Sequence, residues 1–499
     1  MRILTWNVNG IRTVPQHHPW NTLKTHDAIL NHLQADIINF QEVKSSRSAL
    51  PAPVALPPSF DAYYSFPLSK NGYSGVATYT ASGITALNAE EGLTGQLRQP
   101  HLKAPPSVGE RIFSLESYDE FDMPSADLKS LDAEGRVLAF DFGLFVLINV
   151  YCPNDGSTEK DTTRFDYKMA FHRLLEARVR ALIREGREVI LLGDINAYAA
   201  LIDYCEGDII KRRGVGQGFD GDAEEYFWAE NEARRWLRDL LEGDKKCLVD
   251  VVRSYHPERE GMFTCWNTKL SARASNYGTR IDYILVTPGL LPWIKGADIE
   301  PAIIGSDHCP VWIDLHEEIE VHSQELQEGI MTKKLRDVML CSALGEQKRD
   351  PPKLATRFWD EYSGKQLLLE IFFTPGTKKG KAKAKEPVKA ITNVTSPQPH
   401  QILNTTLNQS ESSILSQSSS SSSNTLSSQA WKSLFTRPAP PRCLVHNEVA
   451  KEFKVNKPGI NKGRAFWVCS RPPGPGYDKG RSERPRKEVN PRWRCNFFV

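Results

Sequence analysis

The sequence predicts an α/β protein, a layered α/β sandwich of mixed sheets, followed by a linker and a small terminal domain. Three observations predict this organisation. Short apolar runs that end in polar groups alternate with helical patterns through residues 1–316, which is typical of sheets covered by helices. A polar segment with a serine tract follows. The last part of the chain is short and basic and contains three cysteines.

Length and charge limit the possible functions. A chain of 499 residues is too long for one hydrophobic core and predicts two or three units. The net charge of +2 conceals a gradient, because residues 1–359 carry 40 Lys and Arg against 51 Asp and Glu, whereas residues 431–499 carry 16 against 5. If the acidic first part acts on phosphates, it should need a metal cation. The basic end is typical of a polyanion-binding module.

The chain has no apolar run that approaches the ~20 residues of a membrane span, and its first residues lack the pattern of a signal peptide. We therefore expect a soluble, intracellular protein with no membrane partner.

The first two predicted strands end on polar groups. Residues 1–10 open with an apolar strand and end in Asn-Gly, a turn signal. Residues 23–33 place apolar side chains on one face of a helix, and residues 36–42 form a second strand. Asn7 and Glu42 thus lie at strand ends, where amide and carboxylate oxygens suit Mg²⁺.

The strand at residues 189–196 is the most informative, and it follows two strands and a long helix predicted at residues 73–79, 145–154 and 162–184. A glycine turn at its end delivers Asp194 and Asn196. These two groups suit a site where one takes a proton and the other donates hydrogen bonds to a developing charge. An ordinary strand-to-loop turn is the alternative interpretation.

Two more strands, at residues 280–286 and 310–315, complete a series of six polar clusters at strand ends. The clusters are Trp6–Arg12, Gln41–Glu42, Tyr151–Asn154, Gly193–Asn196, Arg280–Tyr283 and Gly305–His308. In order and spacing they resemble the motifs of the exonuclease III-type family of apurinic/apyrimidinic (AP) endonucleases. The resemblance covers residues 1–316 and implies the endonuclease/exonuclease/phosphatase fold, a four-layered α/β sandwich with two packed mixed sheets.

The resemblance implies a role for each matching residue. It implies Mg²⁺ or Mn²⁺ ligation by Asn7, Glu42, Asp194, Asn196, Asp307 and His308. It implies catalytic roles for Tyr151, Asp194, Asn196, Asp282 and His308. Asp194 would deprotonate the attacking water, and His308, held in one tautomer by Asp282, would donate to a phosphate oxygen. Taken singly, each residue also has an ordinary structural interpretation, such as a turn histidine for His308.

The resemblance also implies DNA contacts, and the departures from it bear on the substrate. Asn154 would contact the scissile phosphate, and Arg273 and Asn276 match DNA-contacting positions, although a surface loop is the alternative. Cys265 and Thr279 stand where the best-known members place aromatics, so the pocket should hold a flipped abasic sugar less well. We therefore expect 3′-to-5′ exonuclease and 3′-phosphodiesterase activity to dominate over incision at abasic sites.

A further departure concerns the metal. Asn9 stands where the best-known members carry a second aspartate, which should weaken metal binding at that position and which matches one eukaryotic branch of the family.

Residues 317–430 are predicted to be a disordered linker, because they are polar and contain prolines and a serine tract. Within them, residues 366–373 fit the Gln-x-x-aliphatic-x-x-aromatic-aromatic pattern of sliding-clamp (PCNA) ligands. The clamp-binding residues would be Gln366, Leu369, Phe372 and Phe373. A short buried helix is the alternative interpretation.

Residues 431–499 are predicted to be a small domain held together by Zn²⁺, with ligands Cys443, His446, Cys469 and Cys495. The surrounding sequence resembles the GRF-type zinc finger, and so short a stretch needs a staple to fold. Arg464, Phe466 and Trp467 alternate a guanidinium with aromatic rings, as single-stranded DNA binders do, although the two rings also suit a small core.

The resemblance implies a DNA base-excision repair nuclease that acts on double-stranded DNA with abasic sites or damaged 3′ ends, and we expect it in the nucleus. The basic run at residues 378–385 suggests nuclear import, although a solvated linker has the same composition. Two alternatives remain at this point. One is a phosphodiesterase of the same broad fold that acts on RNA, lipid or inositol phosphates, and the other is a non-enzymatic scaffold.

Overall fold

The structure of the protein is a computed structural model, which describes residues 1–68, 72–95, 97, 111–113, 130–155, 163–216, 218–219, 223–322, 330–339, 349–362, 441–443, 446–454 and 465–471. The chain divides into two compact units, Met1–Gly380 and Lys381–Val499. Within the described ranges, no helix combines the length and the apolar character needed to cross a bilayer.

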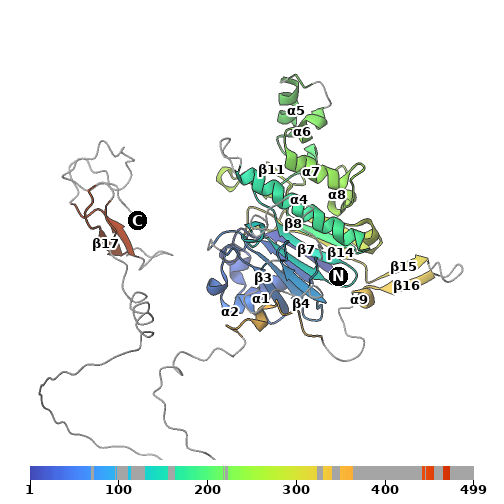
Figure 1. The fold of residues 1–499 in the computed structure, drawn as a ribbon, viewed down its shortest axis with the longest axis horizontal. Helices are drawn as coiled ribbons and strands as arrows, with labels where there is room; N and C mark the ends of the chain where they lie inside the picture. Colours follow the sequence, from blue (N-terminus) through green and yellow to red (C-terminus); the bar gives the residue numbers. More distant parts are fainter. Residues whose placement is uncertain are drawn as a thin grey trace, which may run out of the picture. The chain divides into compact units, whose positions relative to one another are not determined.

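The larger unit is built on two six-stranded mixed sheets (Figure 1). In the first sheet β1 and β2 run parallel, and every other neighbouring pair is antiparallel. Its strands, in spatial order, are β13 (Ile294–Ile299), β14 (Val311–Leu315), β1 (Arg2–Asn7), β2 (Ile37–Gln41), β4 (Val76–Ala81) and β3 (Phe60–Ser65).

The second sheet also contains one parallel pair, β7 with β8, among antiparallel neighbours. Its strands, in spatial order, are β5 (Asn88–Glu91), β6 (Val137–Asp141), β7 (Val146–Tyr151), β8 (Val189–Asp194), β12 (Asp282–Val286) and β9 (Val249–Asp250). The strands predicted at the polar clusters are present, each within a few residues of its expected bounds.

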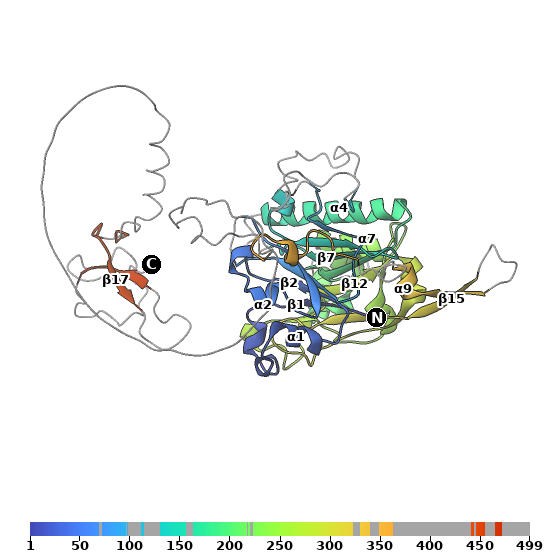
Figure 2. The same ribbon diagram turned by 90° about the horizontal axis from the view of Figure 1, so that it is seen from below.

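The two sheets pack face to face, and helices cover both outer faces (Figure 2). Alternating residues such as Ile3 and Ile190 fill the core between the sheets. On the outer face of the first sheet α1 (His26–His32) packs through Ile29 and Leu30, and Thr25 caps its first turn. On the second sheet lie α4 (Thr163–Arg184) and α7 (Glu232–Leu241). The predicted four-layered α/β sandwich is therefore confirmed.

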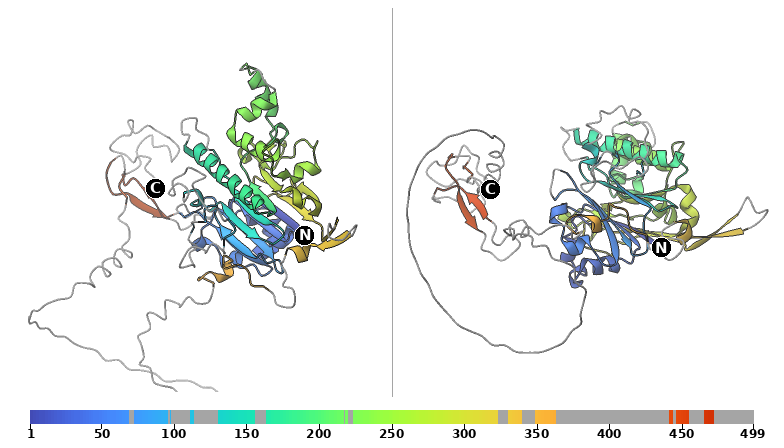
Figure 3. Two further views of the ribbon diagram at one scale, coloured as in Figure 1. Left: turned by 45° about the vertical axis from the view of Figure 1, so that its right-hand side comes forward. Right: turned by 60° about the horizontal axis from the view of Figure 1, so that its bottom comes forward.

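Other described elements of this unit lie between and around the strands. They are α2 (Ala52–Ala55), α5 (Gly207–Gly216), α6 (Ala223–Ala229), α8 (Val251–Tyr255), α9 (Leu335–Val338), β10 (Cys265–Trp266) and β11 (Gly278–Thr279). Helices α5 and α6, drawn in green, project from the sandwich (Figure 3). The short pair β10 and β11 runs beside the polar strand ends.

Described structure continues beyond residue 317, where the linker is predicted to begin. β15 (Glu318–His322) and β16 (Ile330–Lys334) form a hairpin, and Leu335 of α9 joins the core between the sheets. Further on, Trp359 is 4% exposed and packs near Tyr64, and the Arg47 guanidinium donates to both carboxylate oxygens of Glu361 at 2.8 and 2.6 Å. The apolar residues here are too sparse to form their own core, but they pack on the sandwich.

The described part of the smaller unit includes β17 (Lys451–Lys454) and β18 (Ala465–Val468), which pair antiparallel. Phe453 and Phe466 stack on this hairpin with ring centroids 5.9 Å apart. The predicted clamp-binding residues 366–373, together with Arg464 and Cys495, lie outside the described residues.

Candidate active site

The polar ends of the central strands meet at one edge of the sandwich. β1 ends at Asn7, and Glu42 directly follows β2, its parallel neighbour. In the second sheet Tyr151 and Asp194 are register partners at the ends of β7 and β8, and Asp194 also faces Asp282 at the start of β12. The parallel pairs place these groups together because both strands of a pair end at the same edge.

The backbone at this edge adopts unusual conformations. Gly193 has a φ of 129°, and a Cβ atom there would meet the carbonyl oxygen of Val150 at 2.0 Å, so only glycine fits. Four non-glycine residues of the site, Asn9, Glu42, Lys44 and Asn196, have φ values of 46°, 52°, 49° and 52°. Such conformations are costly and are concentrated at functional sites.

The site has two halves, one around Glu42 and one formed by His308 and Asp282. Glu42 is the centre of the first half. Its carboxylate accepts hydrogen bonds from Asn7 Nδ2 at 3.2 Å and from the Tyr151 hydroxyl at 2.8 Å, and it lies 2.5 Å from the Lys44 ammonium. Burial alone would raise the pKa of Glu42, but Lys44, Asn7 and Tyr151 together hold it below its usual value. Glu42 is therefore an anion, ready to bind a cation.

Asp194 links the two halves. It is 1% exposed and accepts from Asn7 Nδ2 at 2.8 Å and from the backbone N–H of Asn196 at 3.0 Å. Burial and the facing carboxylate of Asp282 raise the pKa of Asp194 to about 7. A carboxylate with a pKa near neutrality is suited to take a proton as a general base.

His308 and Asp282 form the second half. Nδ1 of His308 lies 2.8 Å from Oδ2 of Asp282, and both residues are buried. Burial would lower the pKa of His308, but Asp282 raises it well above its usual value. His308 is therefore held in a fixed orientation as a proton-bearing donor.

The donor set fits a divalent cation. One ligand atom from each of Asp194, Asp282 and His308 lies within 4.8 Å of the others, and Oδ1 of Asp282 is buried without a hydrogen-bond partner. Asp307 lies at the edge of the site, where its carboxylate accepts from Asn9 Nδ2 at 2.9 Å and from the Ser306 hydroxyl at 3.1 Å.

The amides Asn154 and Asn196 lie together at the solvent side of the site. Nδ2 of Asn154 donates to Oδ1 of Asn196 at 3.4 Å, and Nδ2 of Asn196 donates to the Cys152 carbonyl at 2.9 Å. Asn154 is exposed and Asn196 half-buried, so both can reach a substrate.

The structure adds three residues that the sequence patterns did not single out. Lys44 donates to Asn9 Oδ1 and pairs with Glu42; its position two residues after Glu42 was the one available signal. The Arg136 guanidinium lies 4.4 Å from the ring centroid of Tyr151, and Lys168 Nζ donates to the Asn196 carbonyl at 2.8 Å. Both are buried charges, and the site residue that each contacts lies 15 residues away for Arg136 and 28 residues away for Lys168, so no local pattern links them to the site.

Arg273 and Asn276 lie apart from this cluster, and their side chains bind protein groups. The Arg273 guanidinium donates to the carbonyls of Ser306 and Ile303 at 3.0 and 2.6 Å. Asn276 Nδ2 donates to the Gly261 carbonyl at 2.9 Å, and its Oδ1 accepts from Trp266 Nε1 at 3.1 Å. In this structure both side chains fix the loops around the site.

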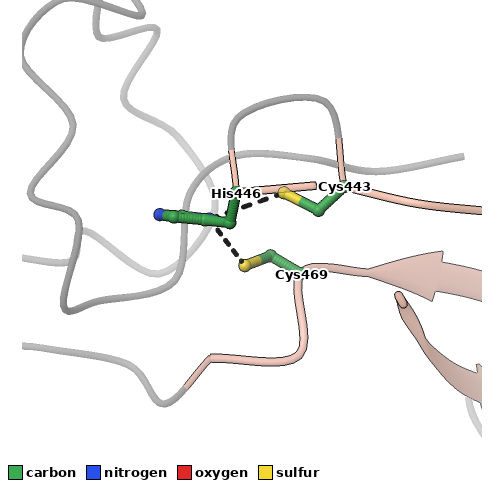
Figure 4. A group of neighbouring side chains, drawn as sticks. All are labelled: Cys443, His446 and Cys469. Carbon is green, nitrogen blue, oxygen red and sulfur yellow. Dashed lines mark hydrogen bonds between the residues drawn. The ribbon is translucent and has the colours of Figure 1, made fainter. Parts of the chain in front are cut away.

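The smaller unit holds a second donor set (Figure 4). Nδ1 of His446 lies 3.5 Å from Cys443 Sγ and 3.4 Å from Cys469 Sγ. Tetrahedral Zn²⁺ with its usual Zn–S and Zn–N bond lengths would separate sulfur and nitrogen ligands by ~3.6 Å. The three described side chains therefore fit a Zn²⁺ site, and Phe466 and Trp467 lie half-buried on the neighbouring strand β18.

Comparisons with known proteins agree with this geometry. Residues 4–308 match the Endonuclease/Exonuclease/phosphatase family. A DNA-(apurinic or apyrimidinic site) endonuclease 2 from Schizosaccharomyces pombe is 34% identical over 549 residues, which cover 100% of this chain and 98% of that protein. An exodeoxyribonuclease from Bacillus subtilis is 28% identical over 312 residues, which cover 62% of this chain and 98% of that protein.

A solved structure is similar to the larger part of the chain. The crystal structure of the AP endonuclease 2 catalytic domain from Xenopus laevis superposes with a TM-score of 0.55 at 30% sequence identity. The superposition covers 73% of this chain and 99% of that domain.

Proposed function

We propose that this chain, which belongs to the Endonuclease/Exonuclease/phosphatase family and within it to the AP endonuclease 2 group, hydrolyses DNA phosphodiester bonds at damaged 3′ ends and at abasic sites. Its family membership makes it a hydrolase and a nuclease of DNA repair. The observation that carries the proposal is the single hydrogen-bonded cluster of carboxylates, amides and an imidazole at the strand ends, because such a set suits phosphodiester hydrolysis.

Family members use divalent metals, and we propose Mg²⁺ or Mn²⁺ as the catalytic cation. The residues that would hold it are oxygen donors and one imidazole, namely Asn7, Glu42, Asp194, Asn196, Asp307 and His308. When bound, the cation would neutralise charge on the phosphate and on the leaving oxygen. The lowered pKa of Glu42 supports this, because an anionic carboxylate is available over the whole neutral range.

Asp194 is the proposed general base. Its hydrogen bonds to Asn7 and to the Asn196 amide fix both carboxylate oxygens, and its pKa of about 7 allows it to take the proton of an attacking water near neutral pH. Asn196 and His308 would donate to the phosphate oxygens as charge develops, and Asp282 would hold the imidazole in place. Tyr151 and Asn154 would contact the scissile phosphate.

We propose that 3′-to-5′ exonuclease and 3′-phosphodiesterase activity exceed incision at abasic sites. Cys265 and Thr279 are direct partners in the pair β10 and β11, and Cys265 also faces His308. A thiol and a hydroxyl at this place offer a flipped sugar less apolar contact than aromatic rings would.

Two labelled duplexes test these proposals, one with an internal abasic site and one with a recessed, mismatched 3′ end. In Mg²⁺ the protein should resect the 3′ end faster than it incises the abasic site, and Asp194→Asn should remove both activities. Glu258→Gln is the matched control, since Glu258 is an exposed carboxylate outside the cluster. Equal or faster incision of the abasic site would contradict the preference, and full activity of Asp194→Asn would contradict the assignment of the base.

We propose that the smaller unit is a zinc finger that binds single-stranded DNA through Arg464, Phe466 and Trp467, with Cys495 as the fourth Zn²⁺ ligand. The tetrahedral spacing at His446 supports the metal, and the basic composition supports the ligand. Arg464→Ala should weaken binding to a labelled single strand while the zinc content stays at one equivalent. Unchanged binding would remove Arg464 from the interface.

For residues 366–373 we propose binding to a sliding clamp (PCNA) through the plug of Leu369, Phe372 and Phe373. Replacing both phenylalanines with alanine should abolish capture by immobilised clamp, and Thr374→Ala, next to the plug, should not. Capture of the double variant would exclude this segment. Since clamp and substrate are chromosomal, we also propose a nuclear location, which microscopy of a tagged full-length chain tests.

A further inference from the structure

Helix α4 places two buried polar side chains against the turn at residues 194–196, which ends β8 and is called the β8 turn below. Lys168 and His172 are four residues apart, so they lie on the same face of the helix. Nζ of Lys168 donates to the Asn196 carbonyl at 2.8 Å, and Nε2 of His172 lies 3.4 Å from the Ile195 carbonyl oxygen. The helix therefore contacts two consecutive carbonyl groups of the β8 turn.

Asn196 is the residue of this turn that needs support, because its backbone is left-handed with a φ of 52°. Such a conformation is costly for a residue that carries a side chain. The backbone N–H of Asn196 donates to Oδ1 of Asp194 at 3.0 Å, and its side-chain Nδ2 donates to the Cys152 carbonyl at 2.9 Å. Lys168 holds the remaining backbone group, the carbonyl, and so fixes the peptide from which the side-chain amide extends.

Lys168 is a buried ammonium, with only 2% of the residue exposed. Besides its hydrogen bond to Asn196, Nζ lies 3.9 Å from Oδ2 of Asp155, whose side chain is 40% exposed. An ammonium loses its hydration when it is buried, so this position is costly unless the charge makes strong interactions. A hydrogen bond from a charged donor is stronger than one from a neutral donor. The charge of Lys168 is therefore explained by the carbonyl that it holds.

His172 contacts the β8 turn without a charge. Its ring is fully buried and stacks on Trp236 of α7, with ring centroids 4.2 Å apart. Burial and the nearby Lys168 ammonium lower the pKa of His172 to about 3, so the imidazole is neutral at neutral pH. A neutral imidazole has one N–H to offer, which suits the Ile195 carbonyl. The positive charge under the β8 turn thus comes from Lys168.

We propose that Lys168 is a positioning residue of the active site. Its ammonium holds the β8 turn in the left-handed form and thereby orients the side-chain amide of Asn196 toward the substrate phosphate. Lys168 is buried, so it acts through Asn196 and does not contact the substrate. The catalytic effect rests on the proposed role of Asn196 as a donor to the phosphate, but the hold on the turn does not.

The first experiment is a kinetic double-mutant cycle on 3′-end resection at saturating Mg²⁺. Lys168→Met removes the ammonium but keeps a long apolar side chain, and Asn196→Gly removes the amide but accepts the left-handed backbone. Lys168→Met alone should lower kcat by at least about 10-fold and change KM by less than about threefold, because the substrate still binds while the donor is misplaced. In the Asn196→Gly protein, Lys168→Met should lower kcat by less than about threefold further.

The matched control is on the same helix. Arg180 lies about three turns further along α4 and also donates to a backbone carbonyl, that of Lys245, at 2.7 Å. Arg180→Met should leave kcat unchanged. An equal effect of Lys168→Met with and without the Asn196 side chain would overturn the proposal, because Lys168 would then not act through that amide.

The second experiment measures the hold on the turn without using activity. Hydrogen exchange of the backbone amides in the full-length, DNA-free protein is followed by mass spectrometry. Lys168→Met should speed exchange of the Asn196 amide by at least about 10-fold and leave β3 unchanged, because only the turn loses a hydrogen bond. Arg180→Met should change neither. Unchanged exchange at Asn196, or an equal increase that includes β3, would overturn the positioning role.

The two measurements also separate this proposal from the proposed function. Faster exchange at Asn196 in a protein whose unaltered form does not cleave DNA would uphold the hold on the turn and refute the nuclease function instead. Thermal unfolding shows whether each variant is folded. Lys168→Gln, a shorter neutral side chain, replaces Lys168→Met if the methionine variant is not.

Discussion

A buried network of charges beside the catalytic strands supplies a stability prediction. The Arg280 guanidinium, 1% exposed, donates from Nε and one Nη to the two carboxylate oxygens of Asp203, both at 2.8 Å. Arg253 adds a hydrogen bond to Asp203 at 2.6 Å, and a carboxylate oxygen of Asp250 lies 2.7 Å from Arg280. Two positive and two negative groups therefore balance, and Asp203 is fully buried.

We predict that Asp203→Asn lowers the free energy of unfolding by about 3 kcal/mol. The substitution keeps the shape of the side chain but leaves one positive charge uncompensated, and removing one partner of a buried pair costs ~3–5 kcal/mol. The lower end of that range is expected because Asp250 still faces Arg280. Urea denaturation of the two proteins, followed by tryptophan fluorescence, measures the difference.

An exposed ion pair serves as the matched control. Arg173 pairs with Glu232 at 2.9 Å, and their side chains are 63% and 38% exposed. Arg173→Gln should cost less than ~1 kcal/mol, because water and salt screen such pairs. The argument from burial is refuted if Asp203→Asn costs no more than Arg173→Gln.

Three further predictions concern the site and its support. Trp359→Ala should lower the free energy of unfolding by ~3–5 kcal/mol, the usual cost of truncating a buried tryptophan. A smaller loss, measured by urea denaturation, would show that the segment around Trp359 is not part of the core. Asp282→Asn should reduce kcat by at least about 100-fold, because the His308 imidazole loses its carboxylate partner. Steady-state rates of 3′-end resection measure this reduction. A reduction of less than tenfold would contradict the prediction. Asp194→Asn should stabilise the Mg²⁺-free protein at pH 8 but not at pH 3.5. The pKa of Asp194 is raised in the folded state from 3.8 to about 7, so the folded protein loses up to ~4 kcal/mol of stability as the pH rises through this range. Urea denaturation of both proteins at the two pH values measures this effect. A difference between the proteins that is the same at both pH values would contradict the reasoning.

The strand ends of the active site were predictable because their signals are local. An apolar run that stops at a polar group marks both the strand and the edge of the sheet where the strand ends, as for Asp194 at the end of β8. The family resemblance then joined six such ends into one site. The pairing of Asp194 with both Tyr151 and Asp282 is the structural outcome.

Other features depend on contacts between distant residues, and no local pattern announces them. Trp359 lies in polar sequence, yet its ring packs near Tyr64, some 300 residues earlier in the chain. Arg273 resembles a DNA contact in sequence, but the fold gives its guanidinium three carbonyls within 3.0 Å. The sequence shows that a side chain is charged, but it does not show which group that side chain will bind in the fold.

The acidity of the catalytic domain accounts for two properties of the site at once. Glu42, Asp194, Asp282 and Asp307 converge against one lysine and one imidazole, so negative charge is in excess. Burial and that excess together raise the pKa of Asp194 to about 7, which suits its proposed role as a base near neutral pH. Excess negative charge also repels a phosphate, so the carboxylates around the proposed base should need a cation before DNA can approach. The proposed metal dependence and the proposed general-base catalysis would therefore follow from one charge arrangement. A variant that removes Asp282 should weaken both the proton affinity of Asp194 and the affinity for the cation.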